Sequence, residues 1–214
     1  MAMNWTLALP EIVLAGAGLL ILLGGVIPKK DTFFPVSMAV IGALVLTAGL
    51  VLGQPEGTAF LGQYVADAFS RFAKVLILLG AALGLVLALD WNAKEGLARF
   101  EFSVLVLFAT LGMLVMVSAN DLMTLYMGLE LLSLSLYVIA AFDRDNPRSA
   151  EAGLKYFVLG ALASGLLLYG ASLVYGFAGT TNFDRIADSL AGGPPATGLV
   201  IGLVFVLAGL AFKV

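Results

Sequence analysis

The chain alternates long apolar runs with short polar breaks. A helix that crosses the hydrocarbon core of a bilayer needs about 20 mainly apolar residues, and most of the runs are close to that length. The breaks carry turn-forming residues, as in IPKKD, GQPEG and DRDNPRSA. The pattern predicts about seven transmembrane helices, at 8–27, 35–53, 71–89, 101–118, 122–142, 152–177 and 197–214. The fold class that follows is an all-α polytopic membrane protein, with a single transmembrane helical domain over residues 1–214.

Composition agrees with this class and removes several kinds of chemistry. Hydrophobic residues make up 61% of the 214 residues and charged residues 12%, whereas soluble domains have about 45–50% and about 25%. The chain has no cysteine and no histidine, which excludes disulfides, thiolate and imidazole metal ligands and a Ser-His-Asp triad. We therefore expect no metal and no cofactor bound by this chain. Its net charge of −3, with scattered basic residues, gives no nucleic-acid footprint.

The basic residues outside the runs predict an orientation, because loops on the cytoplasmic side of a membrane carry the excess of Lys and Arg. One set of alternate breaks holds Lys29, Lys30, Lys94, Arg99, Arg144 and Arg148. The other set holds Arg185, while Arg71 and Lys74 lie just inside the third run. This asymmetry predicts an N-terminus on the outside. The last run, VIGLVFVLAGLAFKV, ends without a polar cap, so we expect the chain to be the N-terminal part of a longer protein.

Three ionisable residues lie within the runs. Glu130 is about nine residues into the fifth run, Lys155 a few residues into the sixth, and Lys213 near the end of the seventh. A charge at the bilayer centre costs about 2.5–3.5 kcal/mol on insertion scales, so it requires a partner, a wet cavity or a function. Each residue also has a simpler interpretation. Glu130 could form a structural hydrogen bond between helices, Lys155 could snorkel to the interface, and Lys213 could be an ordinary lysine at a helix end.

The neighbours of these residues favour a functional interpretation. At about 100° per residue, Tyr126, Glu130, Ser133 and Tyr137 share one narrow helix face. The face of Lys213 holds three glycines, Gly198, Gly202 and Gly209. Glycines let helices approach closely, which points the lysine into the bundle. Burial disfavours the charged forms of an acid and an amine, whereas pairing favours them, so making or breaking such a pair switches where a proton sits.

Three segments resemble a known family. They are LGMLVMVSANDLMTLYMGLELLSLSLYVIAAF, SAEAGLKYFVLGALASGLLLYG and GLAFKV. Together they resemble the antiporter-like membrane subunits of respiratory complex I, and the N-type members in particular, from about residue 100 onward. The resemblance implies that Glu130 matches the family's fifth-helix glutamate and Lys213 the lysine at the break of its seventh helix. Lys155 would match the sixth-helix lysine of the N-type members. Family members have about fourteen helices, so this chain would hold the leading ones and an incomplete first repeat.

The function implied by the resemblance is that of a proton-translocating membrane subunit of NADH:quinone oxidoreductase. The holoenzyme would contain FMN, iron–sulfur clusters and quinone, with no redox chemistry in this chain. Its partners would be other membrane subunits and the lipid bilayer, with no nucleic acid. The compartment would be a bacterial inner membrane, with an organelle inner membrane as the second choice. The alternatives are a subunit of a multisubunit Na+/H+ antiporter or membrane-bound hydrogenase, and a scaffold subunit that conducts no protons.

Overall fold

The computed structural model describes residues 4–27, 32–191 and 194–213. Eight α-helices lie in these ranges: α1 Leu9–Val26, α2 Phe33–Leu52, α3 Ala68–Lys94, α4 Phe100–Val117, α5 Leu122–Ala140, α6 Pro147–Ala178, α7 Phe183–Ala191 and α8 Thr197–Ala211. A short 3-10 helix, η1 (Trp5–Ala8), precedes α1. The connection from α2 to α3 contains β1 (Gly57–Ala59), η2 (Phe60–Gly62) and β2 (Tyr64–Ala66), and the two strands pair antiparallel.

The predicted class is confirmed. Within the described residues, α1 to α6 are long and apolar enough to cross a membrane, and α8 is a shorter apolar helix. Two helices differ from their predicted ranges by several residues. α6 begins at Pro147 rather than 152, because Asn146 caps it and proline is favoured in the first turn. α3 extends to Lys94 rather than 89 and begins at Ala68 rather than 71.

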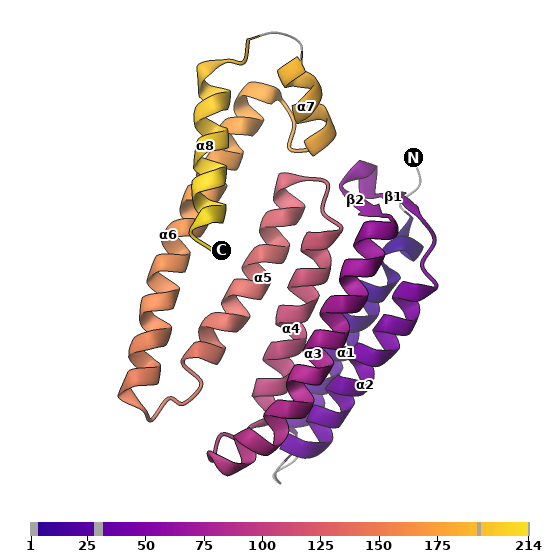
Figure 1. The fold of residues 1–214 in the computed structure, drawn as a ribbon, viewed down its shortest axis with the longest axis vertical. Helices are drawn as coiled ribbons and strands as arrows, with labels where there is room; N and C mark the ends of the chain where they lie inside the picture. The colour runs from indigo at the N-terminus through magenta and orange to yellow at the C-terminus, as the bar shows by residue number, and fades with distance from the viewer. Residues whose placement is uncertain (1–3, 28–31, 192–193, 214) are drawn as a thin grey trace.

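Figure 1 shows the helices in two groups. α1 to α4 form a bundle, and α5 packs along α4. The core of this bundle is a cluster of buried aliphatic side chains that includes Leu14, Val40, Leu44, Leu78 and Leu107. α8 packs along the C-terminal half of α6, on the other side of α5. The boundary between the two groups therefore lies between α5 and the α6–α8 pair.

Local hydrogen bonds fix where α3 begins. The Ser70 N–H donates to the Asp67 side chain at 2.7 Å, and the Asp67 N–H donates to the Ser70 hydroxyl at 2.8 Å. This reciprocal arrangement is a capping box. The hydrogen bond from the Ser70 N–H holds the pKa of the exposed Asp67 carboxyl below its usual value. The cap stays intact wherever Asp67 is ionised, and protonation in acid removes its contribution to the stability of the fold.

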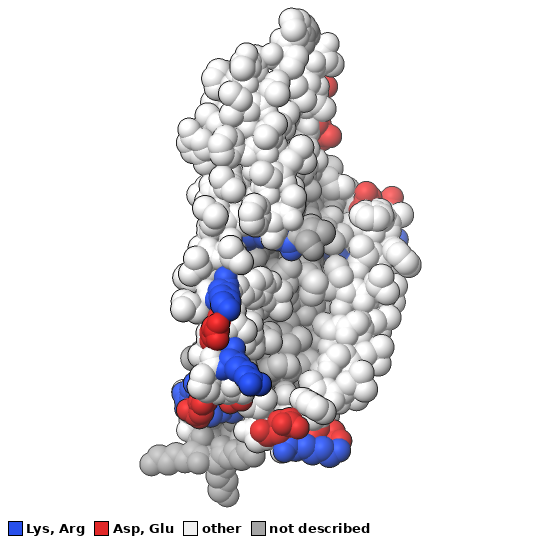
Figure 2. All heavy atoms as spheres, turned by 60° about the vertical axis from the view of Figure 1, so that its left-hand side comes forward, with Lys and Arg blue, Asp and Glu red and all other residues white. Residues whose placement is uncertain are grey.

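Connections that alternate along the chain lie at the same end of the molecule. Tyr64 of the hairpin bridges to Ala119 in the turn between α4 and α5, and Asp121 bridges to Asn182 before α7. The Gly62 carbonyl accepts from the side chains of both Asn120 and Asn182 at 3.1 Å. The turns α3–α4 and α5–α6 lie at the opposite end (Figure 1). Many of the charged side chains visible in Figure 2 gather near that opposite end.

Glycines set the distance between the packed helices. A Cβ atom on Gly112 of α4 would lie 2.6 Å from the Gly128 carbonyl oxygen of α5. A Cβ on Gly170 of α6 would lie 2.6 Å from the Val206 nitrogen of α8, and one on Gly209 would lie 2.8 Å from the Ala163 carbonyl oxygen. Such distances leave no room for a methyl group. Both helix pairs therefore depend on backbone-to-backbone contact.

We expect Gly170→Ala to lower the stability of the full-length protein, because the new methyl group forces α6 away from α8. Overpacking of this kind costs about 1–3 kcal/mol. Gly165→Ala on the same helix is the matched control, since a Cβ there has nothing within 4 Å, and it gains helix propensity of up to about 1 kcal/mol. Thermal unfolding of both variants in detergent checks this. Equal stabilities would contradict the close packing of α6 on α8.

Candidate functional site

The position of Glu130 is set by the start of α5. The buried Asp121 caps this helix, and its Oδ1 accepts from the N–H groups of Met123 at 2.8 Å and Thr124 at 3.3 Å. Oδ2 of Asp121 accepts from the Thr181 hydroxyl at 2.6 Å, which ties the cap to the segment after α6. Counted from the first residue of α5, Glu130 lies about 12 Å along the helix axis. That depth is well inside the apolar part of the span.

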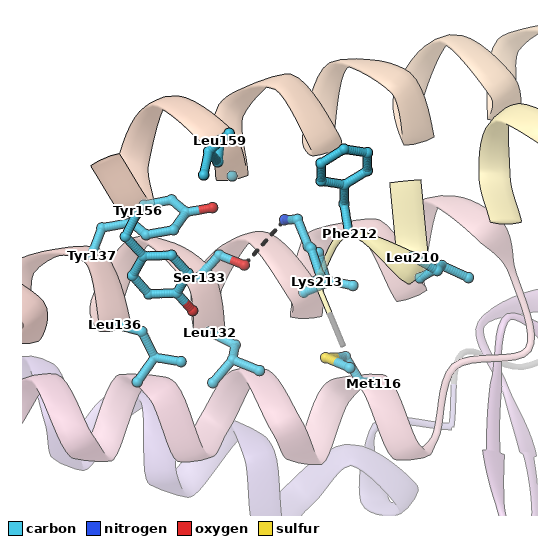
Figure 3. A pocket seen from close by; sticks show the side chains of 12 residues that line it. Met116, Leu132, Ser133, Leu136, Tyr137, Tyr156, Leu159, Leu210, Phe212 and Lys213 are labelled. Atoms are coloured by element: carbon cyan, nitrogen blue, oxygen red, sulfur yellow. Dashed lines mark hydrogen bonds between the residues drawn. The ribbon is translucent and has the colours of Figure 1, made fainter. Parts of the chain in front are cut away.

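Glu130 forms an ion pair with Lys213. The ammonium of Lys213, in the turn after α8, lies 2.8 Å from Glu130 Oε1, and the two side chains are 10% and 20% exposed. The same ammonium donates to the Ser133 hydroxyl at 3.1 Å, the bond drawn in Figure 3. Oε1 of Glu130 also accepts from the hydroxyl of Ser164 on α6 at 2.5 Å. The pair therefore joins α5 to both helices of the α6–α8 pair.

A cavity of about 310 Å³ lies beside the Lys213 ammonium. Its wall is mainly apolar and comes from α4, α5, α6 and the end of α8. Four polar side chains also line it: Ser133, Tyr137, Tyr156 and Lys213 (Figure 3). One water occupies about 30 Å³ of liquid volume, so the cavity has room for several waters with polar partners. A proton could leave or reach Lys213 through such waters.

The predicted polar stripe of α5 is only partly used. Ser133 contacts the pair directly. Tyr137 is buried, lines the cavity and packs edge-on against Tyr156, with ring centroids 4.8 Å apart. Gly160 of α6 makes room for it, because a Cβ there would overlap the Tyr137 hydroxyl. Tyr126 is partly exposed, and no hydrogen bond joins it to the pair within the described residues.

The structure does not bring Lys155 to this pair. Its ammonium lies 2.6 Å from Glu151, one turn earlier on α6, and both side chains are largely exposed. α6 has 32 residues, about 48 Å at 1.5 Å per residue, which is longer than the roughly 30 Å hydrocarbon core. Lys155 lies in the first third of this helix, so an interfacial position is open to it. A role for Lys155 in proton transfer stays a prediction.

Sequence reasoning missed a second buried pair. The Lys74 ammonium of α3 lies 2.6 Å from Glu11 of α1, and their side chains are 0% and 7% exposed. The predicted third run began at 71, which put Lys74 at its edge, but α3 begins at Ala68 and Lys74 is almost two turns inside. The sequence did contain a signal for this pair. Glu11 lies near the start of the first run and Lys74 lies in the third, so both are close to the same membrane face.

Tyr64 of the hairpin completes this second site. Its hydroxyl accepts from Lys74 at 2.7 Å and donates to the Leu7 carbonyl at 3.0 Å. The amide of Gln54 contacts both the Leu7 carbonyl and the Tyr64 hydroxyl. Burial, reinforced by the negative charge of Glu11, raises the pKa of the Tyr64 phenol well above its usual value. The phenol therefore remains a hydrogen-bond donor over the whole physiological pH range.

These features define a class of protein: a helical membrane protein with buried Glu–Lys pairs, adjoining hydroxyl groups and a cavity beside one lysine. No group of three or more acidic, histidine or cysteine side chains that could hold a metal occurs within residues 4–27, 32–191 and 194–213. Proton transfer is the chemistry that such residues can perform without a metal or a cofactor.

Comparisons with known proteins agree with this class. A family described as NADH:quinone oxidoreductase/Mrp antiporter, TM matches residues 119–214. NADH-quinone oxidoreductase subunit N of Granulibacter bethesdensis is 59% identical over 99% of this chain and 45% of its own. The protein of the same description from Rhodospirillum rubrum is 60% identical over 97% of this chain and 44% of its own. The chain thus spans a little under half the length of these relatives.

Two solved structures have the same fold. Respiratory complex I from Thermus thermophilus contains a chain that is 34% identical, with a TM-score of 0.74 over 95% of this chain and 43% of that one. A chain of an archaeal membrane-bound sulfane sulfur reductase also gives a TM-score of 0.74, at 22% identity over 98% of this chain and 44% of that one. The chain is similar to the antiporter-like membrane subunits of NADH:quinone oxidoreductase, and its curated relatives are of the subunit N type.

We expect Lys74→Met to destabilise the protein by about 3–5 kcal/mol, because it leaves the Glu11 carboxylate buried without its counter-charge. Adding Glu11→Gln should recover most of this loss, since replacing both charges of a buried pair is often close to neutral. Thermal unfolding of the single and double variants measures the difference. A double variant less stable than Lys74→Met alone would contradict an ion pair at this site.

Proposed function

We propose that this chain is the leading part of a proton-translocating membrane subunit of NADH:quinone oxidoreductase. The observation that carries the proposal is the Glu130–Lys213 pair, with its 2.8 Å contact between α5 and the end of α8 and a cavity beside the lysine. The identity of 59% and 60% to two proteins described as subunit N supports it. Since the chain spans less than half of those relatives, the activity belongs to the longer protein within its complex.

The proposed mechanism is a switch in the pair. While the two charges are in contact, each favours the ionised form of the other, and Lys213 keeps its proton. When they separate in a medium of low dielectric, both ionised forms become costly, and Lys213 releases its proton into the cavity or to Glu130. Return of the pair requires reprotonation of the lysine and, where Glu130 took the proton, its release from the acid. A small movement of α6 and α8 relative to α5 is sufficient to drive this cycle.

The chain's own residues do no redox chemistry in this proposal. The iron–sulfur clusters would be bound by other parts of the holoenzyme, because these 214 residues have no cysteine or histidine to ligate iron. FMN and quinone would also be bound elsewhere in the holoenzyme. Its partners would be the other membrane subunits of the complex and the surrounding lipid. The location would be a bacterial inner membrane, with the N-terminus and the hairpin on the outer side.

A Na+/H+ antiporter subunit is the second candidate, because the description of the matching family includes Mrp antiporters. Copurification with peripheral iron–sulfur subunits separates the two, since only the oxidoreductase, or the hydrogenase named above, contains such subunits. A scaffold that conducts no protons is the third. In that case neutral hydrogen-bonding residues in place of Glu130 and Lys213 would leave coupling intact.

We expect Glu130→Gln to leave the complex assembled while it strongly lowers both quinone-coupled NADH oxidation and proton pumping. Glutamine keeps the size and hydrogen bonding of the side chain but cannot carry a transferable proton. A blocked proton step in a tightly coupled machine also stalls electron transfer, so both rates fall together. Turnover and the proton-to-electron ratio in sealed vesicles are the measurements.

Glu101→Gln is the matched control, because Glu101 is exposed at the start of α4. It should behave as wild type. Lys213→Ala should cost less in the Glu130→Gln background than alone, since two residues that act as a unit are not additive. A Glu130→Gln variant with wild-type turnover and a wild-type proton-to-electron ratio would contradict the proposal. Glu130 would then be a structural hydrogen-bonding residue.

The proposed orientation predicts a labelling pattern. The 214 residues contain no cysteine, so a single one can be introduced at exposed Asp145, between α5 and α6, or at exposed Asp188 on α7. In intact cells that make the full-length protein, a membrane-impermeant maleimide should label Asp188→Cys and not Asp145→Cys. The opposite pattern would reverse the orientation.

A further inference from the structure

Ser164 uses its hydroxyl differently from four other buried hydroxyl residues in the spans. A serine or threonine inside a helix commonly donates to the carbonyl four residues earlier. Four buried residues do so here, with bonds of 2.7–2.8 Å, namely Ser37, Thr47, Thr110 and Ser135. The described bond of Ser164 instead goes to another helix, to Oε1 of Glu130. The local bond available to a helical serine is replaced by one to the central carboxylate.

Packing fixes where this hydroxyl can lie. Ser164 is only 7% exposed and follows Ala163, whose carbonyl oxygen faces Gly209 of α8 at a close contact between the two helices. α6 is therefore held against α8 at this level, and the Ser164 side chain is directed to α5. The backbone that carries this hydroxyl cannot move away from α5 without α8.

The chemistry of a hydroxyl differs from that of the lysine on the same carboxylate. An ammonium group only donates hydrogen bonds, whereas a hydroxyl both donates and accepts. Ser164 can donate to Glu130 when the acid is ionised, and it can accept from Glu130 when the acid is protonated. While it is protonated, Lys213 can serve only the first state. When the ion pair opens, Ser164 is thus the partner that still satisfies the carboxyl group, which would otherwise be left unpaired in low dielectric.

We propose that Ser164 is a positioning residue for proton transfer, holding the Glu130 carboxyl group toward α6 in both of its protonation states while Lys213 leaves and returns. The proposal rests on the proposed function of the Glu130–Lys213 pair and adds a third group to it. Without this hydroxyl, a protonated Glu130 turns away from the path of Lys213, and the pair forms again more slowly.

The test compares variants of the whole complex in sealed vesicles. Ser164→Ala should assemble normally and lower quinone-coupled turnover about tenfold, which corresponds to about 1.4 kcal/mol. Ser164→Thr and Ser164→Val have the same shape and differ only in the hydroxyl, so threonine should restore turnover and valine should not. Ser135→Ala is the control, because it removes a buried hydroxyl that bonds only to its own helix.

A second comparison shows whether Ser164 acts through Glu130. In a Glu130→Gln background, Ser164→Ala should cause little further loss, since the group that it positions is already disabled. Wild-type turnover in Ser164→Ala, equal turnover of the threonine and valine variants, or an unchanged tenfold loss in the Glu130→Gln background would each overturn the role of Ser164. These results are distinct from a fully active Glu130→Gln, which would overturn the proposed function itself.

Discussion

A charged group inside hydrocarbon must have a partner, and the structure is built around two such partnerships. Each consists of a glutamate on one helix and a lysine on another, at 2.6 Å for Glu11–Lys74 and 2.8 Å for Glu130–Lys213. Each lysine also contacts a hydroxyl group, Tyr64 in the first pair and Ser133 in the second. Glycine holds α8 close to α6, whose Ser164 also contacts Glu130.

The two pairs have the same chemistry and opposite surroundings. Glu11 and Lys74 both belong to the α1–α4 bundle, and Tyr64 joins them to the hairpin that covers its end. The pair is nearly inaccessible and can separate only if that bundle comes apart. Glu130 and Lys213 lie on opposite sides of the division between α5 and the α6–α8 pair, beside a cavity. One pair therefore lies within a single bundle, and the other joins α5 to the α6–α8 pair.

The sequence predicted the membrane spans and the central pair, because both leave strong local signals. Apolar runs define spans by length, and a single acid within such a run stands out. The hairpin was not foreseen, since three-residue strands such as Gly57–Ala59 have no periodicity to detect. Lys74 was counted as interfacial because hydropathy does not reveal that α3 begins three residues before its apolar run. Lys155 was placed within a span because the apolar run began only at residue 152. The pattern could not reveal that α6 starts at Pro147 and that this lysine is exposed, next to Glu151.

The order of the partners along the chain has a consequence for how the protein is made. Glu130 precedes Lys213 by 83 residues, so at roughly 5–20 residues per second its counter-charge is synthesised about 4–17 s later. Ser164, only 34 residues away, is the first of its two partners to emerge from the ribosome. During that interval the serine hydroxyl is the one of these two partners that has already been made. The ion pair can form only after the end of α8 has been synthesised.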